Sequence, residues 1–160
     1  DVGRIITIKS KTGGCLCGAV RFETVGKPKR VSICHCRYCQ LRTGTAFGVG
    51  VYFNSEQITL NDGATDTYSY ETENGSTTEL LRCTKCGTTV SWTISTGALR
   101  HMVAIAGATF DPPTFWYDVE REVFTRSKAE FCHISVPESY NESPIYNPVR
   151  RDSGRLKGGN

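Results

Sequence analysis

Seven of the eight cysteines stand in three short clusters, and this grouping constrains the fold more than any other feature of the sequence. The clusters are Cys15-x-Cys17, Cys34-x-Cys36-x-x-Cys39 and Cys83-x-x-Cys86. Closely spaced thiols, separated by long stretches of chain, are typical of proteins that assemble a tetrahedral zinc site from distant segments. The sequence therefore predicts a fold built around zinc-binding knuckles.

The seven thiols divide into one set of four and one set of three. Cys34, Cys36 and Cys39 are close enough in sequence to reach one ion unaided, and a grouping that splits them strands two thiols. The two pairs together supply four ligands, Cys15, Cys17, Cys83 and Cys86. Four thiolates close a structural zinc site, whereas three leave a coordination position for water or substrate. We therefore expect two zinc ions, a structural one on the set of four and a catalytic one on the set of three.

Eight cysteines could instead form four disulfides in a secreted protein. Neighbouring thiols such as Cys34 and Cys36 rarely bridge efficiently to one another, and secreted disulfide scaffolds are usually shorter than this chain. Residues 1–10 also lack the apolar core and the small-residue cleavage site of a secretory signal. We expect metal ligands in place of disulfides, and hence a reducing, cytoplasmic location.

The length of 160 residues suits one domain with a modest core. The formal net charge of +3 is compatible with an enzyme that attracts small anions, and falls short of a nucleic-acid-binding footprint. The longest nearly apolar stretch, Met102 to Phe110, is too short to span a bilayer. We expect neither nucleic acid nor membrane as a partner. We place a zinc-binding domain at residues 1–136 and a polar tail at residues 137–160, and we favour a solvated extension over a tail laid against a surface.

Short alternating and β-branched stretches predict a mostly-β chain. Residues 19–25 alternate apolar and polar side chains as a half-buried strand does. Residues 5–8, 31–33 and 47–53 are also typical of strands. The Asn-Gly pair within residues 73–76 lies between two β-forming runs and predicts a hairpin. No long amphipathic helix is expected.

Cys132, His35 and His101 are the remaining candidate ligands. Cys132 lies in Phe131–Ile134, a predicted strand, where Cys132 or His133 could complete the three-thiol site. We favour the alternative that Cys132 is a small buried apolar residue. His35 is out of phase with the cysteines beside it, so we expect it to support a ligand or to lie on the surface. His101 has no partner identifiable from the sequence and is assigned a surface or core position.

Together these motifs resemble the glutathione-dependent formaldehyde-activating enzyme family, which also includes a domain of centromere protein V. The resemblance is carried by Gly13–Phe22, Cys34–Gln40, Thr43-Gly44, Phe47, Cys83–Thr88 and Phe124–Ala129. It implies a β-tent-type fold with a structural zinc on the set of four cysteines and a catalytic zinc on the set of three. The implied activity is that of a carbon–sulfur lyase, which condenses glutathione with formaldehyde to give S-(hydroxymethyl)glutathione.

Two positions depart from the pattern of that family. Glu122 stands where the family commonly has a histidine, and Glu130-Phe131 replaces a common Pro-Trp pair. Both changes lie away from the predicted metal ligands but could border the pocket. They therefore bear on which substrate the chain takes.

A zinc ion with an open coordination position suggests roles for the residues near it. A substrate thiol would ionise at that position and attack the aldehyde carbon. Arg37 and Arg42 are candidates to bind substrate carboxylates, although each could equally be an ordinary surface charge. Gln40, Thr43 and the backbone around Gly44 are candidates to donate hydrogen bonds to the aldehyde oxygen.

Two other functions are compatible with the same motifs. A non-enzymatic zinc-binding interaction module would show a basic or apolar surface patch, for which the basic C-terminal tail is the one candidate. A thiol-redox enzyme would use Cys39 or Cys132 as a metal-free reactive group. Zinc content separates the redox hypothesis from the lyase hypothesis, because a redox thiol cannot be occupied by a metal ion.

Overall fold

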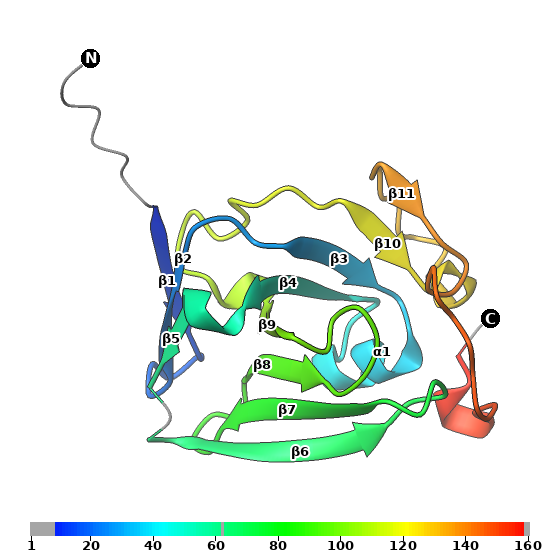
Figure 1. Cartoon of the computed structure of the whole chain (residues 1–160), viewed down its shortest axis with the longest axis horizontal. Coiled ribbons are helices and arrows are strands. Elements are labelled where there is room, and N and C mark those ends of the chain that lie inside the picture. Colours follow the sequence, from blue (N-terminus) through cyan, green and yellow to red (C-terminus); the bar gives the residue numbers. More distant parts are fainter. Residues whose placement is uncertain (1–8, 62, 159–160) are drawn as a thin grey trace.

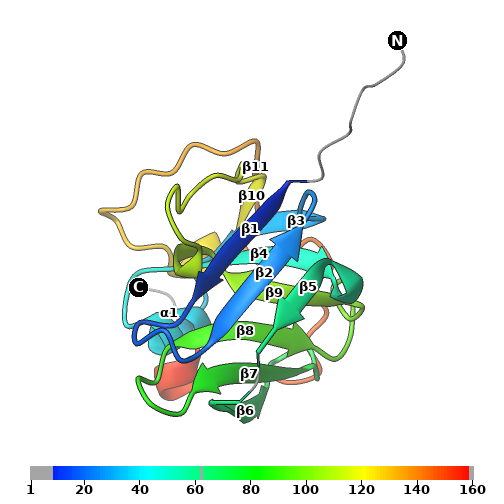
Figure 2. The ribbon, with the colours of Figure 1, turned by 90° about the vertical axis from the view of Figure 1, so that its left-hand side faces the viewer.

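The strands assemble into two sheets in a computed structural model that describes residues 9–61 and 63–158 (Figure 1). The small sheet has the order β1–β2–β5, with β1 at Ser10–Gly14, β2 at Arg21–Val25 and β5 at Ile58–Leu60. The large sheet has the order β11–β10–β3–β4–β9–β8–β7–β6. Figure 2 shows the small sheet lying across one face of the large sheet.

The large sheet is antiparallel except at one edge. Its strands in chain order are β3 at Arg30–Cys34, β4 at Gly48–Asn54, β6 at Thr65–Glu71, β7 at Thr77–Cys83, β8 at Thr89–Ile94, β9 at Met102–Ala106, β10 at Arg121–Val123 and β11 at Glu138–Ser139. Strand β10 runs parallel to both β3 and β11. Because β6 and β11 are the outer strands, the sheet is open and forms no closed barrel.

The two faces of the large sheet have different surroundings, as the alternating side chains of β4 show. Val51 and Phe53 are fully buried and pack with Phe22 of the small sheet in the main core. Gly50 and Tyr52 alternate with these residues and therefore lie on the opposite face. One face thus buries the core, and the other is free to line a cavity.

The described residues form one α-helix, α1 at Arg37–Thr43, which follows β3 after two residues. Its N-cap is Cys36, and Gly44, at a φ of 71°, ends it in the left-handed conformation that glycine adopts without strain. Short 3₁₀ turns lie at Ser55–Gln57, Gly107–Thr109, Thr125–Ser127 and Gly154–Leu156. Within the described ranges, no helix has the length and apolar character needed to cross a membrane.

The structure confirms a mostly-β single domain, and it confirms the hairpin at residues 73–76, where β6 pairs antiparallel with β7. The strand predicted at residues 5–8 lies outside the described residues. The strand predicted at Phe131–Ile134 is wrong, because these residues join no sheet and Phe131 is 78% exposed. The β-tent type stays a prediction.

The C-terminal residues do not form the solvated tail expected from their polar composition. Glu138 and Ser139 extend the edge of the large sheet as β11. Farther on, the backbone N–H of Asp152 donates to the buried Glu73 carboxylate at 2.8 Å. The prediction of a solvated extension was wrong because polar side chains there find hydrogen-bond partners on the domain surface.

Candidate metal centres and the adjoining cavity

The four-cysteine cluster, Cys15, Cys17, Cys83 and Cys86, joins the turn between β1 and β2 to the turn between β7 and β8. Its four sulfur atoms all lie within 4.8 Å of one another. Gly18 and Gly87 have φ values of 81° and 78°, which let each turn reverse tightly enough for both of its cysteines to face inward. The cluster therefore connects parts of the chain that are far apart in sequence.

The sulfur separations of this cluster test whether a metal ion fits. Sulfur atoms bound tetrahedrally to zinc, with bonds of about 2.3 Å, lie about 3.8 Å apart. The Sγ of Cys17 is 3.6 Å from that of Cys15 and 3.7 Å from that of Cys83. Backbone N–H groups also point at two of the sulfurs, from Val20 to Cys15 at 3.2 Å and from Lys85 to Cys83 at 3.4 Å. Such donors favour ionised sulfur, so the cluster fits a metal ion.

The three-cysteine cluster, Cys34, Cys36 and Cys39, lies at the junction of β3 and α1. Cys34 is the last residue of β3, Cys36 caps the helix and Cys39 lies in its first turn. The Cys36 sulfur accepts a hydrogen bond from the backbone N–H of Cys39 at 3.4 Å. The three sulfur atoms lie within 4.8 Å of one another. Local chain geometry alone thus assembles this cluster.

The charge balance of these three thiols favours a bound cation. Hydrogen bonds from Cys34 and Cys36 hold the pKa of Cys39 well below its usual value, and the nearby Arg42 charge acts in the same direction. The same sharing of hydrogens raises the pKa of Cys34 well above its usual value. Without a cation, the three thiols therefore compete with one another for ionisation. A divalent cation would let all three ionise together, so this donor set also fits a metal ion.

The three-cysteine cluster, unlike the four-cysteine cluster, forms part of the wall of a large cavity of about 640 Å³. The wall combines the free face of the large sheet, helix α1 and residues 143–157. Six basic side chains line it, Arg30, Arg37, Arg42, Arg121, Arg126 and Lys157. Two acidic side chains line it, Glu73 and Asp152. The lining is therefore positively charged overall and suits an anionic molecule.

Arg42 is a basic residue of the cavity wall whose charge acts on Cys39. Its guanidinium lies 4.1 Å from the centre of the Trp92 ring, a stacked cation–π arrangement. The Nη2 atom of Arg42 fills the space beside Gly48, where any residue with a Cβ atom would clash with it. Its Nη2 atom is buried without a hydrogen-bond partner among the described residues. Arg42 therefore lies between the Trp92 ring and Cys39 in the cavity wall.

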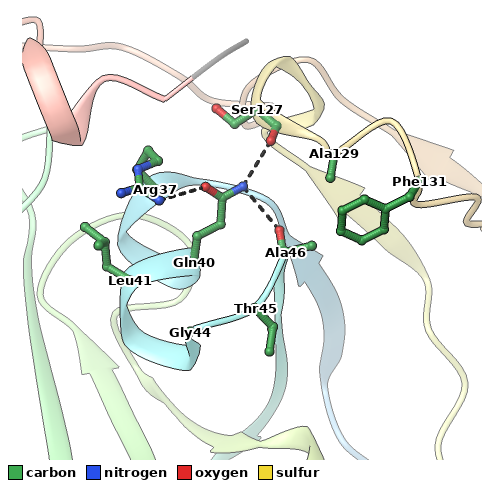
Figure 3. Close-up of a pocket in the computed structure, with 9 residues that line it drawn as sticks. All are labelled: Arg37, Gln40, Leu41, Gly44, Thr45, Ala46, Ser127, Ala129 and Phe131. Carbon is green, nitrogen blue, oxygen red and sulfur yellow. Dashed lines mark hydrogen bonds between the residues drawn. The ribbon is translucent and has the colours of Figure 1, made fainter.

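The other predicted substrate-binding residues lie mostly around a second, smaller cavity of about 490 Å³ (Figure 3). Gln40 and Gly44 line this smaller cavity and not the large one. The Gln40 amide nitrogen donates to the carbonyl oxygens of Ala46 and Ser127, as Figure 3 shows. Gln40 thus ties α1 to neighbouring segments, which accounts for its donors without a substrate.

Thr43 and Arg37 also use donors within the protein. The Thr43 hydroxyl donates to the carbonyl of Cys39 at 2.8 Å, and Thr43 lines neither cavity. The backbone N–H of Gly44 donates to the Gln40 carbonyl at 2.8 Å. Arg37 lines both cavities, and its Nε donates to the carbonyl of Arg155 at 2.9 Å. Of the five predicted residues, only Arg37 and Arg42 reach the cavity of the three-cysteine cluster.

His35 and Glu122 form a buried pair beside the three-cysteine cluster. His35 is completely buried, so the surface alternative is excluded, and its Nε2 lies 3.9 Å from a Glu122 oxygen. Glu122 is itself 2% exposed and accepts hydrogen bonds from Lys128 at 2.8 Å and Ser139 at 3.2 Å. Glu122 does not line the large cavity, whereas its neighbour Arg121 does. The substitution of the family histidine by Glu122 therefore lies behind the cavity wall.

Cys132 and His133 do not complete the three-cysteine cluster. Neither belongs to it, and His133 is exposed. Cys132 is half-buried, so the favoured interpretation of a buried apolar residue is correct only in part. Within the described residues all eight cysteines are free thiols, and His101 is exposed.

Sequence reasoning missed a hydrogen-bonded network that holds residues 143–157 at the large cavity. Glu73, 7% exposed, accepts hydrogen bonds from the Tyr146 hydroxyl and, at 3.2 Å, from Arg126. Asp152 accepts one from the Tyr38 hydroxyl of α1 at 2.6 Å. No spacing rule connects these residues, because they are up to 114 positions apart. They show that the C-terminal residues belong to the site.

The comparison with protein-family models agrees with the predicted family. A family model described as glutathione-dependent formaldehyde-activating enzyme matches residues 10–127. A crystal structure of a protein from Rhodobacter sphaeroides is similar to this chain, with 17% sequence identity and a TM-score of 0.48. That similarity covers 63% of this chain and 88% of the other. A search of curated proteins finds no match.

Proposed function

This chain belongs to the glutathione-dependent formaldehyde-activating enzyme family, and from that membership we propose that it is a zinc-dependent carbon–sulfur lyase. Its substrates would be a small thiol such as glutathione and an aldehyde such as formaldehyde, joined as an S-(hydroxymethyl) adduct. One observation carries the proposal: three thiols that fit a metal ion form part of the wall of a basic cavity. The free thiols also support a reducing compartment such as the cytoplasm.

The two clusters would each hold a zinc ion. In the four-cysteine cluster all four tetrahedral positions would be filled by the protein, which suits a structural site. A zinc ion held by Cys34, Cys36 and Cys39 would supply an open position at which a thiol ionises near neutral pH. We assign these three cysteines to the catalytic site for that reason.

The basic residues of the cavity would orient the thiol substrate. Arg42, which lines the cavity beside Cys39, would bind a substrate carboxylate, because guanidinium matches carboxylate in both charge and geometry. Arg37 would contribute charge from the same wall, although its Nε is already bonded to residue 155. The cavity walls would exclude bulk water from the reacting sulfur and carbon.

The test compares metal content and activity in Cys36→Ser with those of the wild type. Serine is a favoured N-cap, so this change removes a sulfur while keeping a cap for α1. The wild type should carry two zinc equivalents and consume formaldehyde in a thiol-dependent reaction followed by proton NMR. Cys36→Ser should fold, keep one zinc equivalent and lose the reaction.

Cys132→Ser is the matched control, because Cys132 lies outside both clusters. It should retain both zinc equivalents and wild-type activity. A wild-type protein with a single zinc equivalent, or a Cys36→Ser variant with full activity, would refute the proposed function.

A further inference from the structure

We infer that Tyr52 is a further catalytic residue, whose hydroxyl donates a hydrogen bond to the aldehyde oxygen while the carbon–sulfur bond forms. This inference rests on the proposed function and adds to it a residue that lies outside the cysteine motifs. Tyr52 belongs to β4, lines the large cavity and is 8% exposed.

The position follows from the register of β3 and β4. Cys34 pairs with Gly48, and Gly48, Gly50 and Tyr52 share one face of β4. A Cβ atom at Gly50 would lie 2.8 Å from Cε2 and 3.2 Å from Cζ of Tyr52. The ring therefore covers Gly50, which places its hydroxyl-bearing carbon toward Gly48 and the end of β3 that carries Cys34.

Trp92 fixes the role that the Tyr52 hydroxyl can play. The indole Nε1–H donates to the Tyr52 oxygen at 3.3 Å, and the two rings meet edge to face. A phenol oxygen that already accepts a hydrogen bond still has its own proton to donate. Among the described residues the Tyr52 hydroxyl donates to no protein atom. That proton is therefore available to a molecule in the cavity.

The surroundings keep Tyr52 protonated. Burial raises its pKa above the usual value and outweighs the opposite effect of the Trp92 hydrogen bond. A neutral phenol held in a low-dielectric wall can donate a strong hydrogen bond to an oxygen that gains negative charge. Arg42 lies over the Trp92 ring and helps to hold Trp92, and through it the Tyr52 hydroxyl, in place.

In the proposed step, the thiol adds to the aldehyde and every bond and proton is accounted for. The ionised sulfur of the substrate attacks the aldehyde carbon, the carbon–sulfur bond forms, and the π pair of the carbonyl moves to oxygen. The Tyr52 hydroxyl donates to that oxygen as its charge develops. The proton that the thiol lost on ionising returns to the oxygen through solvent, so the sum is thiol plus aldehyde giving the hydroxymethyl thioether. No oxidant or reductant is needed.

Tyr70 is the rival donor, because it lines the same cavity. Its ring stacks on Tyr38 at 5.0 Å, with 7° between the ring planes, and Tyr38 in turn is hydrogen-bonded to Asp152. This stacking makes Tyr70 a bracing residue between β6 and α1. The experiment therefore includes Tyr70→Phe beside Tyr52→Phe.

The kinetic test measures kcat, KM and zinc content of Tyr52→Phe with glutathione and formaldehyde. We expect kcat to fall by roughly 10²–10³, the usual loss for one oxyanion donor, with KM and both zinc equivalents preserved. Tyr68→Phe, a change at an exposed residue of β6, is the matched control and should behave as wild type. A kcat of Tyr52→Phe within about threefold of wild type, or the larger loss in Tyr70→Phe, would overturn the inference.

A binding test gives a readout that needs no turnover. Calorimetry would compare S-(2-hydroxyethyl)glutathione with S-ethylglutathione, which differ by the hydroxyl alone. The wild type should bind the hydroxyethyl compound about threefold to tenfold more tightly, the value of one hydrogen bond, and Tyr52→Phe should lose that preference. A preference that survives in Tyr52→Phe, or is missing in the wild type, contradicts the role of Tyr52. Thiol-independent or absent formaldehyde consumption by the wild type would instead refute the proposed function.

Discussion

The two cysteine clusters use the same ligand atom in different surroundings. The four-cysteine cluster joins two turns whose cysteines lie up to 71 positions apart, from Cys15 to Cys86, and it borders neither of the two cavities. The three-cysteine cluster is assembled within six residues and forms part of the wall of the larger cavity. The number of ligands and the free space beside them distinguish the clusters, since their donor chemistry is the same.

Because of this difference, we expect the loss of each cluster to affect a different property of the protein. A long-range cluster restrains the relative placement of β1, β2, β7 and β8, so its loss acts on the whole fold. A local cluster adds little to chain connectivity, because β3 and α1 are already consecutive. We therefore expect changes in the first to act on stability and changes in the second to act on chemistry.

The largest expected effect is the destabilisation caused by Cys83→Ser. Cys83 is 2% exposed, and its sulfur is 3.7 Å from that of Cys17 across 66 positions of chain. We expect the free energy of unfolding to fall by about 4 kcal/mol or more, because both the proposed metal site and a long-range link are lost. Urea denaturation followed by circular dichroism measures it. Cys36→Ser should lose clearly less, and the reverse order would break the comparison.

The second prediction concerns substrate selection at the three-cysteine cluster. Arg42→Ala should lower kcat/KM for glutathione by about 10-fold to 100-fold, the value of a charge-assisted hydrogen bond to a carboxylate. The same variant should lose much less with 2-mercaptoethanol, which has no carboxylate. Arg82→Ala, which removes a surface partner of Asp66, is the matched control. Equal losses of kcat/KM with both thiols would show that Arg42 supports the structure of the cavity wall and does not bind the substrate carboxylate.

The third prediction concerns the effect of acid on residues 143–157, which line the large cavity beside the three-cysteine cluster. Burial tends to raise the pKa of Glu73, but hydrogen bonds from Tyr146 and the Asp152 backbone and the charge of Arg126 hold it below its usual value. Its contribution to stability is therefore full above the unfolded pKa near 4.5 and is lost as pH falls through the lower folded pKa.

Hydrogen exchange of residues 143–157 measures this effect. Protection should decrease below about pH 4.5 in the wild type, and it should be weaker and nearly independent of pH in Glu73→Gln. Glu79→Gln, at an exposed position of β7, is the control and should keep the wild-type pH profile. Wild-type behaviour in Glu73→Gln would exclude this carboxylate as the anchor of the segment.

The sequence was sufficient to predict elements whose signals are local. Alternation predicted β2, strand-forming residues predicted β4, an Asn-Gly pair predicted the hairpin between β6 and β7, and cysteine spacing predicted the groups of four and three that the structure brings together. Each of these signals depends on neighbours in the chain or on the strict requirements of metal coordination. Such requirements are visible without knowledge of the packing.

The features that sequence reasoning missed depend on contacts between distant residues. Gln40 has a donor amide in a suggestive motif, yet its partners, Ala46 and Ser127, are set by packing. The polar composition after residue 137 suggested solvation, because nothing in the sequence shows that the buried Glu73 accepts hydrogen bonds from Tyr146 and Asp152. The sequence gives Tyr52 no signal beyond that of a strand residue, and only the pairing of β3 with β4 shows that it lies on the cavity face.

The smallest expected effect tests whether the clusters are independent. The Thr88 hydroxyl lies 3.2 Å from the Cys86 sulfur and accepts a hydrogen bond from the Leu16 backbone at 3.2 Å, so it links the two turns of the four-cysteine cluster. Thr88→Val should lower Tm by about 2–4 °C and leave kcat unchanged. Thr84→Val, in the same turn but bonded to the Ala64 carbonyl, is the control for a lost hydroxyl. If Thr88→Val lowers kcat as well, then the four-cysteine cluster influences the proposed catalytic site, and the division between stability and chemistry does not hold.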